Sequence, residues 1–233
     1  MDFSDDAPPP DADLELKIEQ VAAHPEPNGT LRVMVTTSPG EIRAILHPCA
    51  TQPAGAILVG GAMGGFEGPA DDVYGRLGDR LRSHASTLRL HYRRPREFEE
   101  CVLDVLAGVS LLRGLGATGG VALVGHSFGA AVVIKTGELS ESVAGVAALS
   151  PQLYGTRTVE RLAKPLLLVH GMRDGILDHA ASEDIHARAQ EPKRLVLYAE
   201  SDHTLQQNAA DLEELLVAWI PGVVATRRGP SLN

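Results

Sequence analysis

The stretch Val121–Val133 reads VALVGHSFGAAVV and places a serine between two glycines, where one apolar segment ends and another begins. A strand that turns sharply into a helix strains its turn residue, and side chains at the flanking positions would collide with both elements. Gly125 and Gly129 are therefore typical of a tight turn that presents the hydroxyl of Ser127. The following helix directs its N-terminus at the serine, so the backbone N–H of Phe128 is expected to face a developing negative charge.

Composition limits the classes of protein to which the chain can belong. It has 233 residues and is 44% hydrophobic, which suits one domain with a sizeable core. The formal charge of -9 argues against a nucleic-acid partner. Two cysteines, Cys49 and Cys101, are too few for a disulfide framework, and the histidines lack metal-binding spacing. We therefore expect no metal and no cofactor.

The ends of the chain differ in composition from its middle. The first residues, MDFSDDAPPPDADLE, are acidic and proline-rich and lack the apolar region of a secretory signal. No later segment reaches the roughly 18 apolar residues of a membrane span. These features predict a cytoplasmic protein without a membrane partner. We expect a disordered tail at 1–13, one domain at 14–221 and a C-terminal tail at 222–233.

The middle of the chain alternates apolar strands with helices. Antiparallel strands are expected at 14–23, 31–37 and 40–48, followed by strands at 54–61, 86–92, 119–125, 143–150, 164–171 and 192–199 and by helices at 71–83, 96–116, 128–139, 155–163, 178–190 and 204–220. Strands that are apolar throughout, each followed by a helix, indicate a mostly parallel sheet covered on both faces. The short segment 151–163 leaves no room for a cap domain, so an open, shallow site is expected.

Two later loops carry partners for the serine. Asp174 lies in MRDGILD after the strand at 164–171, and His203 lies in ESDHTL after the strand at 192–199. The carboxyl ends of parallel strands meet at one edge of a sheet, where open α/β folds place their sites. The order serine, acid, histidine therefore predicts that Ser127, Asp174 and His203 lie close together.

From about residue 30 to 220 the chain resembles the α/β-hydrolase family, and its small uncapped serine esterases and dienelactone-hydrolase-like proteins in particular. The resemblance implies an α/β-hydrolase fold. It also implies Ser127 as nucleophile, His203 as general base and then acid, and Asp174 as the group that orients the imidazole. Dienelactone hydrolases carry a cysteine nucleophile, so Ser127 is a departure that puts the lactone substrate in doubt.

Three neighbouring residues compete for these roles. Asp178 could replace Asp174 as the acid, but its position favours an N-cap for the helix that follows. Asp202 is beside the histidine in sequence, and a solvated turn is the better interpretation. His126 adjoins the serine, where a structural role is favoured over a catalytic one.

The loop LVGGAMGGFEGP, residues 58–69, should supply the second oxyanion donor. Relatives carry His-Gly before the donor residue, whereas this chain has Gly60 and Gly61. The register is therefore open by one residue, and we favour the N–H of Ala62 over that of Met63. No phosphate-loop spacing fits these glycines, which disfavours nucleotide binding.

Substrate-binding residues are harder to find from the sequence. Arg93 and Arg94 follow the strand at 86–92, so either could bind a substrate carboxylate, although surface pairing with nearby glutamates is the favoured alternative. A modest acyl pocket could be lined by Met63, Phe66, Phe128, Leu153 and Tyr154.

Together these patterns predict a serine hydrolase that cleaves a small ester, thioester or lactone through an acyl-enzyme. The expected partner is a small-molecule acyl substrate, and acyl transfer to another alcohol would use the same residues. The alternative is a non-catalytic receptor or scaffold with the same fold. A scaffold would not need all three of Ser127, Asp174 and His203, and none of them is missing. The oligomeric state is not predicted.

Overall fold

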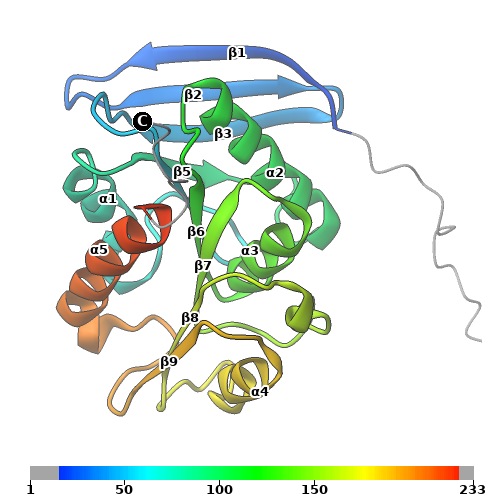
Figure 1. Cartoon of the computed structure of the whole chain (residues 1–233), viewed down its shortest axis with the longest axis vertical. Coiled ribbons are helices and arrows are strands. Elements are labelled where there is room, and N and C mark those ends of the chain that lie inside the picture. The colour runs from blue at the N-terminus through cyan, green and yellow to red at the C-terminus, as the bar shows by residue number, and fades with distance from the viewer. Residues whose placement is uncertain (1–15, 226–233) are drawn as a thin grey trace, which may run out of the picture.

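The computed structural model describes residues 16–225, which form a nine-stranded sheet with helices on both faces (Figure 1). The strand order is β1-β2-β3-β5-β4-β6-β7-β8-β9. This is the mostly parallel α/β-hydrolase fold that the sequence predicts. The tail expected at 1–13 lies outside the described residues.

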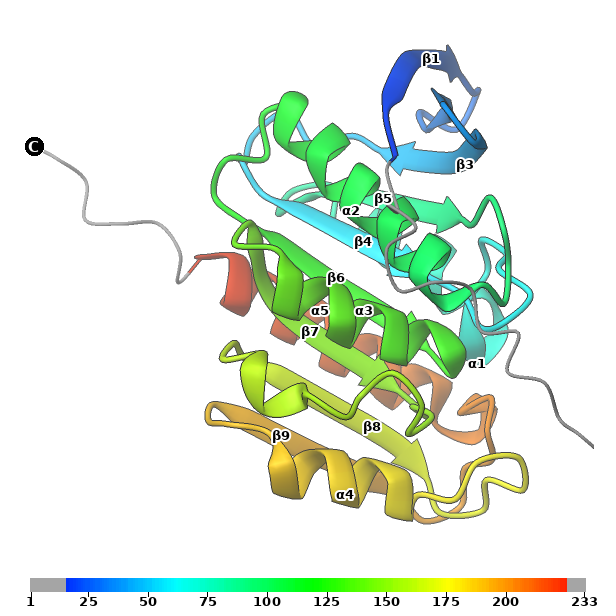
Figure 2. The same ribbon diagram turned by 90° about the vertical axis from the view of Figure 1, so that its right-hand side faces the viewer.

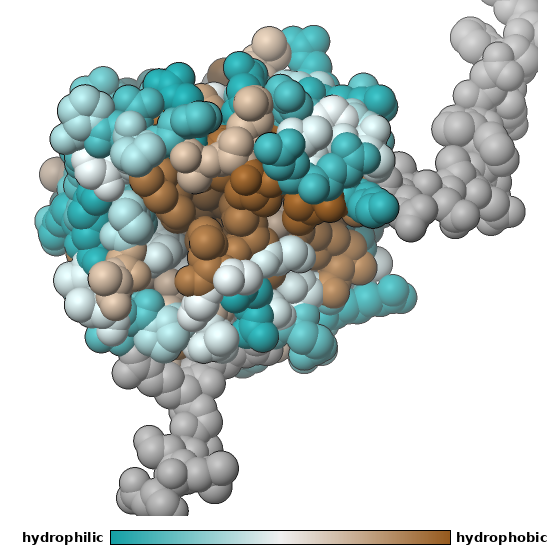
Figure 3. Space-filling view, turned by 90° about the horizontal axis from the view of Figure 1, so that it is seen from above, coloured by the Kyte–Doolittle hydropathy of each residue, from teal (hydrophilic) through white to brown (hydrophobic). Residues whose placement is uncertain are grey.

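The first strands form the antiparallel end of the sheet. They are β1 (Ile18–Pro25), β2 (Leu31–Thr37) and β3 (Gly40–His47), and β3 also pairs antiparallel with β5 (Ser86–His91). Apolar side chains gather at the centre of the face seen from above, over this end of the sheet (Figure 3). Val21 on β1 and Met34 on β2 are among the exposed large apolar side chains of these strands.

The remaining strands run parallel to β5. They are β4 (Gly55–Val59), β6 (Val121–His126), β7 (Val143–Leu149), β8 (Leu166–Gly171) and β9 (Lys193–Tyr198). Their side chains alternate between two cores: Ile57 belongs to one, and its neighbour Leu58 belongs to the other. Both faces are apolar because helices cover both.

The helices lie on both faces of the sheet, and those on each face bury their apolar side chains in the core on that side. On one side lie α1 (Pro69–Arg80) and α5 (Ala209–Ala225). On the other lie α2 (Phe98–Gly114), α3 (Phe128–Leu139) and α4 (Ala180–Arg188), which stand in front of the sheet in Figure 2. None of the helices within residues 16–225 is long and apolar enough to cross a membrane.

The connection between β7 and β8 does not form the helix that the sequence predicts at 155–163. Only one 3₁₀ turn, Val159–Arg161, forms there. Gly155 adopts a φ of 85°, and two β-branched threonines follow, which disfavours a longer helix. Val159 and Leu162 are nonetheless buried against the core. No cap forms in this connection.

The expected domain end at 221 is four residues too early. Helix α5 continues to Ala225, and Val223 and Val224 are buried in the core beneath α1 and α5. Pro221 lies inside this helix, and burial of the two valines offsets the cost of a proline in a helix interior. The rest of the expected C-terminal tail, from residue 226, lies outside the described residues.

We predict that a chain shortened after Pro221 is less stable than one shortened after Ala225. Burial of the two valine side chains contributes about 3 kcal/mol, which the shorter chain loses. Urea unfolding of both chains would measure the difference. Equal midpoints would show that the last turn of α5 adds nothing to the core.

Candidate active site

Ser127 stands at a sharp turn between β6 and α3. Its backbone has a φ of 58° and a ψ of -120°, a conformation that side-chain-bearing residues rarely adopt. A Cβ atom at Gly125 would collide with the carbonyl of Gly129, and one at Gly129 would collide with the carbonyl of Gly60. The two glycines are thus required by close backbone approach, as the spacing in the sequence predicts.

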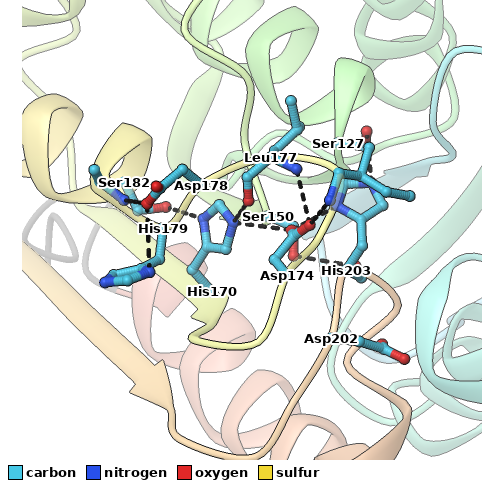
Figure 4. Close-up of polar contacts among 12 residues, drawn as sticks. Ser127, Ser150, His170, Asp174, Leu177, Asp178, His179, Ser182, Asp202 and His203 are labelled. Atoms are coloured by element: carbon cyan, nitrogen blue, oxygen red, sulfur yellow. Dashed lines mark hydrogen bonds and ion pairs between the residues drawn. The ribbon is translucent and has the colours of Figure 1, made fainter.

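The three residues expected at this sheet edge lie in hydrogen-bonding contact (Figure 4). Nε2 of His203 is 3.0 Å from Oγ of Ser127, and Nδ1 of His203 is 2.7 Å from Oδ2 of Asp174. Asp174 follows β8 and its side chain is fully buried, whereas His203 follows β9 and its side chain is 11% exposed. A single imidazole therefore bridges a hydroxyl and a carboxylate.

The carboxylate of Asp174 is held in its charged form. Burial by itself would raise its pKa, but the N–H groups of Leu177 and Ile176 and the ring of His203 outweigh burial and hold the pKa below its usual value. Both N–H groups donate to Oδ1 at 2.8 Å. Oδ2 is thereby left to face His203, whose Nδ1–H donates to it.

His126 supports the loop that carries His203. Its Nε2 is 2.8 Å from the carbonyl oxygen of His203, and the hydroxyl of Ser150 donates to the same oxygen at 3.2 Å. Burial lowers the pKa of His126 to about 4, so its ring is neutral and Nε2–H is the donor. His126 therefore has the structural role that the sequence favours. Ser150 was not predicted, although a serine followed by proline at a strand end marks a turn.

The competing carboxylates point elsewhere. Asp178 is 79% exposed, and its Oδ1 accepts the N–H of Ala180 at the start of α4. Asp202 accepts the N–H and hydroxyl of Thr204, and Figure 4 shows its side chain turned away from His203. Asp178 thus serves the helix start and Asp202 the turn. Asp174 is the only one of the three that contacts the imidazole of His203.

The loop after β4 lies beside the serine. An open depression of about 330 Å³ is lined by Gly60, Gly61, Ala62, Met63, Gly64, Glu67, Gly68, His126, Ser127 and His203. Two buried tyrosines hold the start of this loop: the hydroxyl of Tyr74 donates to Val59 O at 2.9 Å, and that of Tyr92 donates to Gly60 O at 3.4 Å. On the other side, the N–H of Phe128 starts helix α3, where backbone N–H groups lack intrahelical partners.

Comparison with known proteins agrees with this fold. The family model of the dienelactone hydrolase family matches residues 61–217. The chain belongs to the dienelactone hydrolase family. Membership supports a hydrolase activity for this chain. No curated protein sequence matches it.

Solved structures resemble this family member over most of its length. A lidless α/β serine hydrolase from Xanthomonas campestris is 20% identical, with a TM-score of 0.69 over 85% of this chain and 98% of that one. The esterase domain of a Rhodothermus marinus protein is 18% identical, with a TM-score of 0.64 over 91% of this chain and 100% of that one. Acetyl xylan esterase 1 from a Thermoanaerobacterium species is 14% identical, with a TM-score of 0.64 over 88% and 87%. At these identities the likeness shows the fold.

Arg93 pairs with acidic side chains, as the favoured alternative predicts, and this pairing leaves it unsuited to bind a substrate carboxylate. Its side chain is only 2% exposed, and its guanidinium pairs with the fully buried Asp104 and with Glu100, 2.7 Å away. Arg94 pairs with Glu97 and Glu100 near the surface. The sequence carries a signal for this pairing, because Asp104 falls on the apolar face of its helix and a buried carboxylate needs a cation.

Of the other predicted substrate residues, Phe128 is buried, whereas Met63 and Tyr154 are exposed. Met63 is 67% exposed and Tyr154 is 64% exposed. The Tyr154 ring packs edge-on against Phe98, which packs in the same way against Phe128 beside the serine. Arg96 was not predicted; it is exposed and its guanidinium lies 3.0 Å from the sulfur of Met63. Among residues 16–225, no group of three acidic, histidine or cysteine side chains is arranged to hold a metal ion.

We predict that Asp104→Asn destabilises the hydrolase by about 3 kcal/mol, because it leaves the buried Arg93 charge without its main partner. Arg94→Ala, which removes a more exposed cation from the same segment, should change stability by less than about 0.5 kcal/mol. Thermal and urea unfolding would measure both. An unchanged Asp104→Asn protein would mean that the Arg93 pair does not support the fold.

Proposed function

We propose that this family member is a serine hydrolase that cleaves small ester, thioester or lactone bonds through an acyl-enzyme on Ser127. The observation that carries the proposal is the continuous set of hydrogen bonds from Ser127 through His203 to Asp174. Each atom suits its role: Nε2 faces the hydroxyl, and Nδ1 faces an ionised carboxylate.

In the first half of the reaction, Nε2 of neutral His203 takes the proton of the Ser127 hydroxyl as Oγ attacks the substrate carbonyl carbon. The carbonyl oxygen becomes an oxyanion. The imidazolium then returns the proton to the leaving alcohol or thiol as the bond to it breaks, which leaves the acyl group on Oγ. Asp174 stabilises the charged ring without taking its proton.

In the second half of the reaction, a water molecule takes the place that the departed alcohol or thiol occupied. Nε2 takes a proton from the water as its oxygen attacks the acyl carbon, and the proton then passes to Oγ when the carboxylic acid leaves. An alcohol in place of water would give acyl transfer by the same steps.

The oxyanion is assigned to two backbone donors. The N–H of Phe128 begins helix α3, whose dipole favours negative charge there. The second donor is the N–H of Ala62, which lines the same depression as Ser127. The closeness of this loop to the serine supports the assignment: a Cβ atom added to Gly61, the residue before Ala62, would lie 3.6 Å from the Cβ of Ser127.

A small acyl group fits this site best. The lining of the depression is largely glycine and polar side chains, and no cap covers it in residues 16–225. One structural neighbour is named an acetyl xylan esterase, and acetyl is a short acyl group. Longer acyl chains would lie over exposed side chains such as those of Met63 and Tyr154, where methylenes stay hydrated.

The catalytic assignment predicts covalent labelling of Ser127 by a fluorophosphonate and a loss in kcat of about 10⁴-fold or more in Ser127→Ala. Asp174→Asn should lose several orders of magnitude, because the imidazole loses its charged partner. Mass spectrometry and ester-hydrolysis kinetics measure these effects.

Asp178→Asn is the matched control for the acid, since this residue lies four positions away and contacts α4 instead. It should change kcat by only a small factor. Labelling of another serine, or a larger loss in Asp178→Asn than in Asp174→Asn, would overturn the assignment. Absence of both labelling and hydrolysis would favour a non-catalytic binding protein.

The dependence of kcat/KM on the length of the acyl chain should have two parts. Each buried methylene contributes about 0.8 kcal/mol at most, so kcat/KM should rise over the first few acyl carbons and then level or fall. A series of p-nitrophenyl esters from acetate to dodecanoate measures this profile. A steady increase to about twelve carbons would show that a long apolar groove binds the chain.

A further inference from the structure

A second histidine lies behind the site, on the far side of Asp174. His170, near the end of β8, is fully buried and is not one of the three proposed catalytic residues. Its Nε2 is 3.0 Å from Oδ2 of Asp174, the same oxygen that lies 2.7 Å from Nδ1 of His203 (Figure 4). One carboxylate oxygen therefore contacts two imidazole rings.

The contacts of His170 fix which nitrogen carries the proton. Nε2 also lies 3.1 Å from the carbonyl oxygen of Leu177, so both of its neighbours are acceptors and Nε2 must bear hydrogen. Burial lowers the pKa of His170, which keeps the ring neutral. Nδ1 is then an acceptor, and it lies 2.7 Å from the buried hydroxyl of Ser182 on α4, which donates to it.

We propose that His170 is a positioning residue of the catalytic site that donates Nε2–H to Oδ2 of Asp174, and that Ser182 supports this tautomer by donating its hydroxyl to Nδ1. The proposal rests on the hydrolase function proposed above. Neither residue touches the hydroxyl of Ser127; both act through the carboxylate.

Four donors surround the carboxylate of Asp174. Two backbone N–H groups hold Oδ1, and the rings of His170 and His203 hold Oδ2. Without His170, Oδ2 would lose one of its two donors, and the carboxylate would be held less firmly in its position against His203. The four contacts together restrict rotation of the carboxylate and so keep Nε2 of His203 directed at Ser127.

The shared oxygen also affects proton transfer. A donor on Oδ2 spreads its negative charge, which weakens the attraction of Asp174 for the imidazolium form of His203. His126 also lies near His203, with ring centroids 4.8 Å apart, and Glu67 lines the same depression as His203. Asp202 binds Thr204 instead. Loss of the His170 donor should therefore stabilise the imidazolium form of His203, which would then persist to higher pH.

The decisive experiment compares His170→Leu with His170→Gln, whose side-chain amide retains an N–H donor. We expect His170→Leu to lower kcat about tenfold with little change in KM, since the lost bond is to a charged group. The acid limb of the pH profile of kcat/KM should move upward by roughly half a unit. His170→Gln should restore much of both, and Ser182→Ala should shift both in the direction of His170→Leu by a smaller amount.

His47→Leu is the matched control, because His47 is another buried histidine paired with an aspartate, Asp79, at 3.0 Å. It should lower stability without moving the pH profile. An unmoved profile in His170→Leu, or the same shift in His47→Leu, would overturn the proposal. Should His170→Leu not fold, Ser182→Ala retains the imidazole, and an unmoved kcat and profile in that variant would count against the proposal.

Proton NMR separates this proposal from the function on which it rests. The proton between Nδ1 of His203 and Asp174 should give a low-field resonance that moves in His170→Leu whether or not the protein hydrolyses esters. Hydrolysis that survives Ser127→Ala would refute the proposed function alone. A His203 resonance that is the same in wild type and His170→Leu would refute the positioning role alone.

Discussion

The close approach of the backbone at Gly129 to the carbonyl of Gly60 is the contact on which the site depends. It brings the turn after β6 against the loop after β4, so the serine and the loop proposed to hold the oxyanion share one depression. β4 and β6 are adjacent and parallel, and their carboxyl ends therefore meet. Any side chain at 129 would force the two loops apart, and the hydroxyl of Tyr92 fills the remaining space beside them.

Two buried carboxylates in this molecule are compensated in different ways. Asp104 is paired with the guanidinium of Arg93, a full positive charge that fixes helix α2 to the end of β5. Asp174 has no such cation and is stabilised by N–H donors, among them two imidazoles. The difference suits the proposed chemistry, because a neighbouring ring that gains a proton during the reaction finds a negative charge that is not already paired with a cation.

The histidines show how burial sets chemical roles. Burial lowers the pKa of His126 and of His170, so both are neutral donors that hold other groups in place. His126 binds the carbonyl of His203 and His170 binds the carboxylate of Asp174, so a buried ring holds each of the loops after β8 and β9. These hydrogen bonds restrict the positions of His203 and Asp174 and so keep the proposed catalytic groups oriented.

The sequence by itself determined the order of strands and helices, the turn at Ser127 and the identity of the three residues that meet beside it. These features follow from local rules: hydrophobic periodicity, the glycines required at a tight turn, and the meeting of parallel strand ends at one edge. Only the tertiary structure decided that Arg93 turns inward to Asp104, that α5 continues past Pro221, that segment 155–163 forms a single 3₁₀ turn, and that His170 lies on Asp174. Each depends on the direction of a side chain, or on burial against elements distant in the sequence. Periodicity within one segment carries no information about either, because the packing of the whole sheet and its helices sets them.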